Sequence, residues 1–331
     1  MRDTTYDNAK GIGLILVILG HLLPFGNLQS SIIYSIHMPL FFYISGMFIK
    51  NRGGYIRLIF IYIYPYIFFQ FIIGGFIFLA KSFMSDESLG KLISNTISEI
   101  FMFSGSGFTC MDHLWFLISL TISIICTKPI IHYTKLFDRK MIYDISVIVF
   151  LSLIAILMNK CSIILPFRLQ TVPAIIVLLI IGNKYKDYVS MFVDTCSRWR
   201  FCILSVSFVM LSMVNKTVNM SLAVYNNYLL YLLTALLGIS VIIYISKRVR
   251  LKSLKYIGKN TLILFAIHGV WIEVYKILLG HIGISLHDMY NLYCYVGTIV
   301  VLICSFISLL ALKRIYFYYD SALRNFFNIE K

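Results

Sequence analysis

Four histidines stand inside long apolar stretches of this chain, where ionisable side chains are rare. They are His21, His37, His113 and His268. The histidine side chain has a pKa of roughly 6.5, so its neutral imidazole can take up and return a proton at physiological pH. No serine or cysteine stands in a nucleophile motif of the G-x-S-x-G type. The histidines are therefore the side chains that we expect to carry proton-transfer chemistry.

Lys10 and His21 are separated by ten residues. On one helix this spacing places them about 16 Å apart along the axis and within roughly 20° of the same face. His37 lies about six residues into the next apolar segment, at a depth similar to that of His21, so the two imidazoles are predicted to meet. A cation at one helix end and imidazoles deeper in suit a site that draws an anionic cofactor from one side and transfers a proton toward the other.

Packing roles are the alternative for several of these side chains. His113 or His268, taken alone, could bond a neighbouring carbonyl and serve only to hold helices together. Lys10 could be a membrane anchor whose ammonium reaches back to water. Glu273 and Lys276 are three residues apart and could simply neutralise each other. At the level of the sequence both interpretations remain open.

The segment HMPLFFYISG contains a helix breaker next to one of the histidines. Pro39, two residues after His37, is predicted to free a backbone carbonyl one turn earlier and to bend the helix there. Ser45 and Gly46 are small enough to let a second helix approach closely, so packing is their expected role.

The chain that must position these residues is overwhelmingly apolar. It has 331 residues, of which 60% are hydrophobic and 13% are charged, and its mean hydropathy is +0.86. A typical soluble domain has about 25% charged residues. Between Lys10 and Lys50 there are 39 positions without a charge, enough to cross a hydrocarbon layer of roughly 30 Å nearly twice. The composition excludes a soluble globule and predicts an all-α polytopic membrane protein.

Hydropathy and its interruptions predict a bundle of about ten transmembrane helices in a single domain over residues 1–331. The expected spans are roughly 11–26, 31–49, 57–80, 113–134, 141–158, 165–182, 199–215, 222–246, 260–280 and 289–312. The seven cysteines form no C-x-x-C pair and no Cys/His cluster at zinc spacing, so we expect neither a disulfide framework nor a metal site.

The distribution of lysine and arginine predicts the orientation of these spans. With a cytoplasmic N-terminus, 23 of the 29 basic residues fall in inside segments and five in outside segments. This asymmetry is what the positive-inside rule requires of a protein with both termini in the cytoplasm. It also accounts for the net charge of +15, because the basic residues fall in short loops that face anionic membrane lipids. We therefore expect membrane lipids as partners and do not expect nucleic acid.

Four blocks of sequence carry a resemblance to a known family. They are DNAKGIG with the following Gly20-His21, IHMPLFFYISG from Ile36 to Gly46, HLWFL from His113 to Leu117, and YIGKNTLILFAIH from Tyr256 to His268. In this order they resemble the acyltransferase-3 family of integral membrane acyltransferases, most closely the branch of fucose 4-O-acetylase-like and other polysaccharide O-acetyltransferases. The resemblance covers nearly the whole chain.

The resemblance implies a reaction and roles for residues. The reaction is transfer of an acyl group, usually acetyl from cytoplasmic acetyl-CoA, to a hydroxyl of a cell-surface or lipid-linked glycan at the cell membrane. The family's pattern of a basic residue, ten residues and a histidine falls on Lys10 and His21. His21 is then the expected base or acyl acceptor, and His37 the second proton carrier or oxyanion partner.

Further residues complete the expected site. Members of the family often carry two basic residues three apart between the second and third spans. Arg52 and Arg57 are spaced differently, but they are expected beside Lys10 at the coenzyme A phosphates. The expected substrate-binding residues are His113, Trp115, His268 and Glu273, with a membrane-interface position as the alternative for the tryptophan.

A transporter is the rival function. A glycan or lipid flippase, or a proton-coupled transporter, could use the same histidines as a proton relay, but it would consume no thioester. The sequence leaves open the acceptor sugar, the length of the acyl group, an acyl-enzyme intermediate and the oligomeric state.

Overall fold

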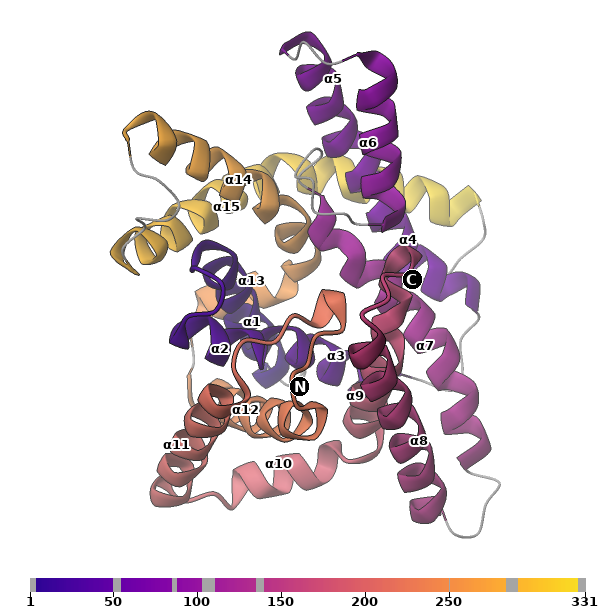
Figure 1. Ribbon diagram of the computed structural model, residues 1–331, viewed down its shortest axis with the longest axis vertical. Helices are drawn as coiled ribbons and strands as arrows, with labels where there is room; N and C mark the ends of the chain where they lie inside the picture. The colour runs from indigo at the N-terminus through magenta and orange to yellow at the C-terminus, as the bar shows by residue number, and fades with distance from the viewer. Residues whose placement is uncertain are drawn as a thin grey trace.

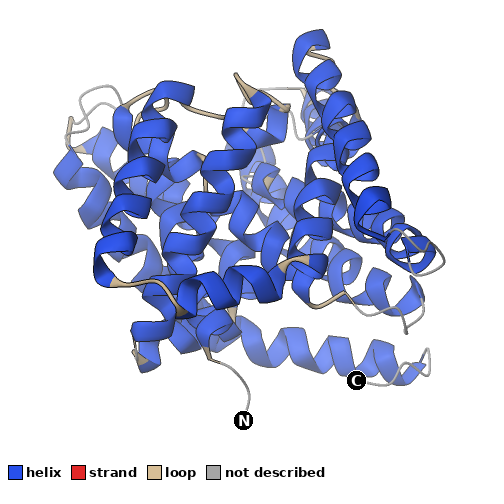
Figure 2. Ribbon diagram, turned by 90° about the horizontal axis from the view of Figure 1, so that it is seen from below, coloured by secondary structure: helices blue, strands red, loops and turns tan. Residues whose placement is uncertain are grey.

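The computed structural model describes residues 4–49, 55–84, 88–102, 111–134, 140–249, 251–283 and 291–326. Within these ranges the chain is built of helices, and the only β-type pairing is an isolated bridge between Asn219 and Val224 (Figure 2). The predicted all-α fold class is therefore confirmed.

The helices follow one another through short connections (Figure 1). Their bounds are α1 Thr5–Leu22, α2 Leu28–Tyr34, α3 His37–Met47, α4 Tyr55–Phe69, the π-helical η1 Gln70–Gly74, α5 Gly75–Met84, α6 Leu89–Met102, the 3-10 turn η2 Asp112–Leu114, α7 Trp115–Thr134, α8 Lys140–Cys161, η3 Pro166–Thr171, α9 Val172–Lys184, α10 Lys186–Asp194, α11 Arg198–Asn215, η4 Met220–Leu222, α12 Tyr228–Arg248, α13 Lys252–Lys259, α14 Thr261–His281 and α15 Asn291–Phe326.

Seven helical segments in the described part of the chain are long and apolar enough to cross a membrane. They are Phe60–Leu79, Asp112–Thr134, Lys140–Cys161, Pro166–Lys184, Tyr228–Arg248, Thr261–His281 and Leu292–Ser321. The remaining three predicted spans coincide with α1, with the broken pair α2–α3 and with α11. A polytopic membrane protein is thus confirmed, while the count of ten spans and the cytoplasmic termini stay predictions.

α1 is the central helix of the bundle, in contact with α2, α3, α12, α13, α14 and α15. It crosses α13 with backbone against backbone, because a Cβ at Gly258 would collide with the carbonyl of Asp7. Asn8 attaches the same part of α1 to the end of α12, since its Nδ2 donates to the carbonyls of Ser246 at 3.2 Å and Val249 at 2.8 Å. The N-terminal half of α1 is thereby fixed to a segment more than 230 residues away in sequence.

α3 and α9 form a second close crossing. Gly46 lies against the backbone of Leu179, and Gly182 lies against the backbone of Tyr43, so neither position has room for a Cβ. Asn183 closes the contact by donating its Nδ2 to the carbonyl of Gly46 at 3.0 Å. The packing role predicted for Gly46 is confirmed. Ser45 lines a cavity, and its packing role stays a prediction.

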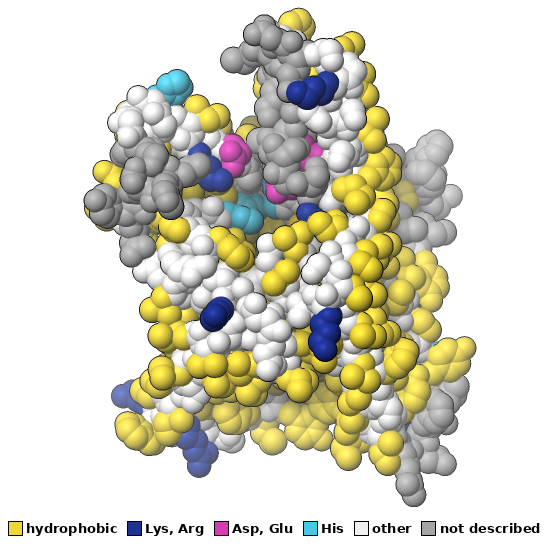
Figure 3. Space-filling model, viewed as in Figure 1, with side chains coloured by type: hydrophobic (Ala, Val, Ile, Leu, Met, Phe, Trp, Pro, Cys, Tyr) yellow, Lys and Arg dark blue, Asp and Glu magenta, His cyan; other side chains and the backbone are white. Residues whose placement is uncertain are grey.

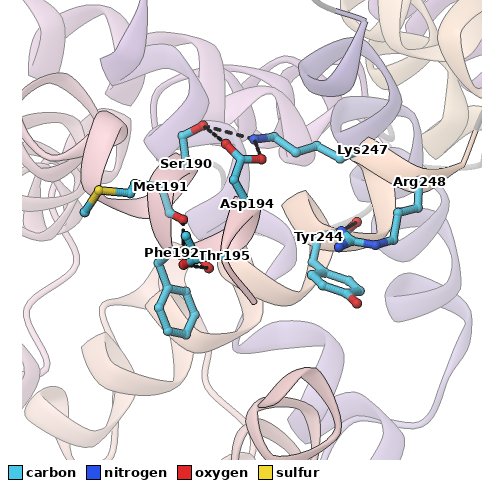
Figure 4. A network of polar contacts seen from close by, with 8 residues as sticks. All are labelled: Ser190, Met191, Phe192, Asp194, Thr195, Tyr244, Lys247 and Arg248. Carbon is cyan, nitrogen blue, oxygen red and sulfur yellow. Dashed lines mark hydrogen bonds and ion pairs between the residues drawn. The ribbon is translucent and has the colours of Figure 1, made fainter. Parts of the chain in front are cut away.

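The short helix α10 is attached to the end of α12 by polar contacts (Figure 4). Lys247 Nζ lies 2.6 Å from a carboxylate oxygen of Asp194 and donates to Ser190 Oγ at 3.0 Å. The hydrogen bond from Lys247 lowers the pKa of Asp194, which favours its ionised form. The neighbouring Arg248 guanidinium lies over the ring of Tyr244, 3.4 Å from its centroid.

Candidate functional site

Three of the predicted histidines meet in the fold and are called the histidine cluster here: His21, His113 and His268. His21 comes from the last turn of α1, His113 from η2 and His268 from the middle of α14. The ring centroids of His113 and His268 are 4.7 Å apart, and those of His21 and His268 are 5.6 Å apart. Residues far apart in the sequence thus form one group of imidazoles.

Backbone carbonyls fix the tautomers of two members of the cluster. The Nε2 of His113 lies 3.1 Å from the carbonyl oxygen of Ala266, and the Nδ1 of His268 bonds the carbonyl of Phe265. A carbonyl only accepts, so each of these ring nitrogens carries the hydrogen and donates. In a neutral His268 the lone pair is therefore on Nε2, which is buried and has no hydrogen-bond partner among the described residues. That atom is a proton acceptor held ready inside the protein.

His37 stands beside the cluster rather than in ring contact with His21. Its Nδ1 lies 2.8 Å from the carbonyl oxygen of Ile33, a bond that crosses the break between α2 and α3. The break precedes Pro39, as predicted, and makes His37 the first residue of α3. The ring of Tyr34 stands edge-to-face on His37 at 4.9 Å, and its hydroxyl donates to the carbonyl of Gly20, next to His21. Tyr34 therefore links the two histidines that were expected to meet directly.

His21 is exposed and lies on the open side of the cluster. A hollow in the molecular surface, between the ends of α14 and of the α5–α6 pair, has histidine at its floor and charged side chains at its edge (Figure 3). Electrostatic interactions reach His21 from Asp112 and Lys276, as well as from His37 and His113. We call this region the histidine hollow. His21 is the exposed member of the histidine cluster, whereas His113 and His268 are buried, so His21 is the member that an entering molecule can reach.

Glu273 forms an ion pair with Lys276, with 2.8 Å between Oε1 and Nζ. The charge neutralisation considered for these two residues therefore takes place. The carboxylate side chain is 41% exposed, so it stays accessible to a ligand, and its role in substrate binding stays a prediction.

A cavity of about 480 Å³ lies among α1, α3, α4, α7, α13 and α14. Most of its lining residues are apolar, and three lysines also line it: Lys10, Lys128 and Lys259. Lys10 also lies 3.4 Å from a carboxylate oxygen of Asp7. We call this space the lysine cavity. It combines cations suited to phosphate with an apolar channel suited to a thin, flexible chain.

Two of these lysines were missed by the sequence analysis. Lys259 lies within the block YIGKNTLILFAIH, which already pointed to this part of the chain, and Lys128 lies next to a proline in α7. Of the arginines expected here, Arg52 lies outside the described residues. Arg57 is in the first turn of α4, but its side chain is not among those described.

Trp115 is buried, and its ring packs against Phe42 with centroids 6.4 Å apart. It begins α7 directly after η2, two residues beyond His113. The alternative of an interfacial ring facing water and lipid headgroups is wrong, because a side chain on the bundle exterior would not be buried. A direct role in substrate binding stays a prediction.

The lysine cavity and the histidine cluster are separated by a few aromatic rings. Phe265 lines the cavity, and its ring centroid lies 5.5 Å from that of His113 and 5.3 Å from that of His268. The arrangement therefore provides anion binding on one side, imidazoles on the other and one side chain's thickness between them. It is suited to moving a small group from an anionic carrier to an acceptor in the histidine hollow.

Comparison with known proteins adds one positive finding. The family model of the acyltransferase-3 type, described as an acyltransferase domain, matches residues 3–312. A search of curated proteins gives no match, and a search of solved structures gives none either.

Proposed function

This chain belongs to the acyltransferase-3 family, and on that premise we propose that it transfers an acetyl group from coenzyme A to a hydroxyl of a cell-surface or lipid-linked glycan. The observation that carries the proposal is the placement of the lysine cavity and the histidine cluster on opposite sides of Phe265. A donor and an acceptor can then approach one another from two faces of a membrane.

The lysine cavity is the proposed donor site. Coenzyme A carries a diphosphate and a 3′-phosphate at one end and a thioester at the end of a long, thin arm. The phosphates would bind Lys10, Lys128 and Lys259 through charge-assisted hydrogen bonds. The arm would then lie along the apolar wall and bring the thioester toward Phe265. The positive-inside distribution supports a cytoplasmic mouth, where acetyl-CoA is available.

The histidine hollow is the proposed acceptor site. A sugar hydroxyl there would attack the thioester carbonyl carbon, forming a C–O bond while the C–S bond breaks. The hydroxyl proton would pass to the imidazole of His21 and from there to the departing coenzyme A thiolate, so that no charge accumulates. The Nε2 of His268 would accept a hydrogen bond from His21 and hold its ring for this exchange.

The test is coenzyme A release from acetyl-CoA by inverted membrane vesicles that contain the protein and its native acceptor. We expect thiol release together with a mass increase of one acetyl group per modified sugar in the envelope glycan. The His21→Ala variant, at matched expression, should give neither. Vesicles that translocate a glycan without consuming acetyl-CoA would instead favour the transporter.

A further inference from the structure

We propose that Phe41, Phe116 and Phe265 form a partition between donor and acceptor sites and that Phe265 restricts the donor to short acyl groups. These three residues are called the phenylalanine layer. The inference rests on the proposed function and deepens it, since it assigns a determinant of donor specificity.

The register of three helices carries the inference. On α3, α7 and α14 the lysine cavity ends at a phenylalanine, and a histidine stands three or four residues away from it, on the same helix for α3 and α14 and in the adjoining turn η2 for α7. The pairs are Phe41 with His37, Phe116 with His113, and Phe265 with His268. Each helix, taken together with η2 in the case of α7, thus contributes one ring to the partition and one imidazole beyond it. The partition is about one helical turn thick, or roughly 5.4 Å.

The ring of Phe116 contacts those of Phe41 and Phe265, and all three side chains line the end of the cavity. The centroid of Phe116 lies 6.1 Å from that of Phe41 and 5.3 Å from that of Phe265. The three residues are 6%, 9% and 5% exposed in the order Phe41, Phe116 and Phe265, so little solvent reaches them from either side. A group held in the lysine cavity therefore touches the imidazoles only if a ring of this layer moves.

Phe265 is the ring that matters most for donor choice. It alone among the three contacts both His113 and His268 while also lining the cavity, within the contacts described for this part of the chain. With the coenzyme phosphates at the lysines, the acyl group is the leading end of the donor and reaches this ring first. A two-carbon acetyl group needs a small displacement, whereas each further methylene extends into the volume that the ring occupies.

The same layer keeps water away from the thioester. The histidine hollow is open, so without the layer its water would reach the donor and hydrolyse it in competition with the sugar hydroxyl. Hydrolysis would break the same C–S bond, but would give free acid and coenzyme A without a modified glycan. Loss of Phe265 should therefore relax chain-length selection and also separate thioester consumption from glycan modification.

The experiment compares acetyl-CoA, butanoyl-CoA and hexanoyl-CoA in inverted vesicles that carry the native acceptor. Coenzyme A release and glycan-bound acyl groups are measured in parallel for the wild type, Phe265→Ala, Phe265→Leu and Phe116→Ala. Phe208→Ala is the matched control, because Phe208 is equally buried, at 6% exposure, but lies on α11 and lines no part of the cavity.

We expect the wild type to prefer acetyl over hexanoyl groups. Phe265→Ala should shift the hexanoyl-to-acetyl ratio by at least about tenfold, the low end of what one methylene is worth in an apolar pocket. It should also raise acceptor-independent coenzyme A release, with Phe265→Leu intermediate. Phe208→Ala should leave the ratio unchanged. Binding of free coenzyme A, measured by calorimetry, should be unaltered in Phe265→Ala and so report a folded donor site.

The possible failures are distinct. A wild type that releases no coenzyme A from any of the three thioesters overturns the proposed function, and the inference with it. The inference alone is overturned by a different result. In that case the wild type is active, Phe265→Ala and Phe116→Ala still bind coenzyme A, and both variants keep the wild-type hexanoyl-to-acetyl ratio.

Discussion

If the lysine cavity is the donor site proposed above, its three lysines should contribute unequally to acetyl-CoA binding, in an order set by their exposure. Lys128 is 9% exposed and also lies over the ring of Tyr55, with Nζ 5.1 Å from its centroid. The Lys10 side chain is 26% exposed and shares its charge with Asp7. Lys259 is exposed. Because water screens an exposed ammonium, we expect the order Lys128, Lys10, Lys259 in decreasing effect.

The magnitudes follow from the same burial. A hydrogen bond to a charged group in a shielded site contributes about 1.5–3 kcal/mol, so Lys128→Ala should raise the KM for acetyl-CoA roughly ten- to hundredfold. An exposed ion pair contributes about 0.2–1 kcal/mol, so Lys259→Ala should raise the KM by at most about fivefold. Lys10→Ala should fall between them, and Lys10→Arg should retain activity because the charge remains.

The assay is the initial rate of coenzyme A release against acetyl-CoA concentration, repeated at low and high salt. Lys160→Ala is the matched control, an exposed lysine at the far end of α8 that lines no part of the lysine cavity. High salt should abolish the difference in KM between Lys259→Ala and the wild type, but it should preserve the difference in KM between Lys128→Ala and the wild type. A larger effect at Lys259 than at Lys128, or three variants that match Lys160→Ala, would refute a donor site built on these cations.

Three further predictions concern catalysis, packing and orientation. His21→Ala should lower glycan acetylation, measured by mass spectrometry, at least about a hundredfold, as expected for loss of a general base. His281→Ala, at the opposite end of α14 from the cavity, should retain near-normal acetylation. Near-normal acetylation in His21→Ala would return His21 to a packing role. Gly182→Val should lower the thermal unfolding temperature in detergent, because its side chain would overlap the Tyr43 backbone, while Gly75→Ala, in open space, should not; equal unfolding temperatures would contradict the close α3–α9 crossing. A cysteine at Lys255 should react with an impermeant thiol reagent only in inverted vesicles, and labelling in intact cells would reverse the orientation and exclude a cytoplasmic donor.

Local patterns in the sequence were enough to predict the fold class and the α2–α3 break. Hydropathy over long windows predicts helices whatever their partners are, and Pro39 acts on its own helix alone. The spacing of Lys10 and His21 likewise needs only the geometry of one helix. These features were predictable because each depends on residues that are neighbours along the chain.

The composition of the site could be predicted only in part, because it depends on which helices pack together. His113 and His268 are brought together by the contact of η2 with α14, and nothing local to either histidine indicates the other. Lys128 reads as an ordinary inner-end lysine until the cavity shows it beside Lys10. The phenylalanine layer is invisible in the sequence, since Phe265 is one of 26 phenylalanines in an apolar chain.

The attachment of α1 to the end of α12 has a consequence for how the protein is made. Among the described residues, the Asn8 side chain donates to the carbonyls of Ser246 and Val249, so 238 residues separate it from the first of these partners. At a synthesis rate of about 5–20 residues per second, the ribosome needs roughly 12–48 s to add the partner after α1 has emerged. During that interval Asn8 lacks these two acceptors, whereas Asp7 and Lys10 can already pair within α1. The attachment of α1 to the end of α12 therefore forms late, after most of the chain has been synthesised.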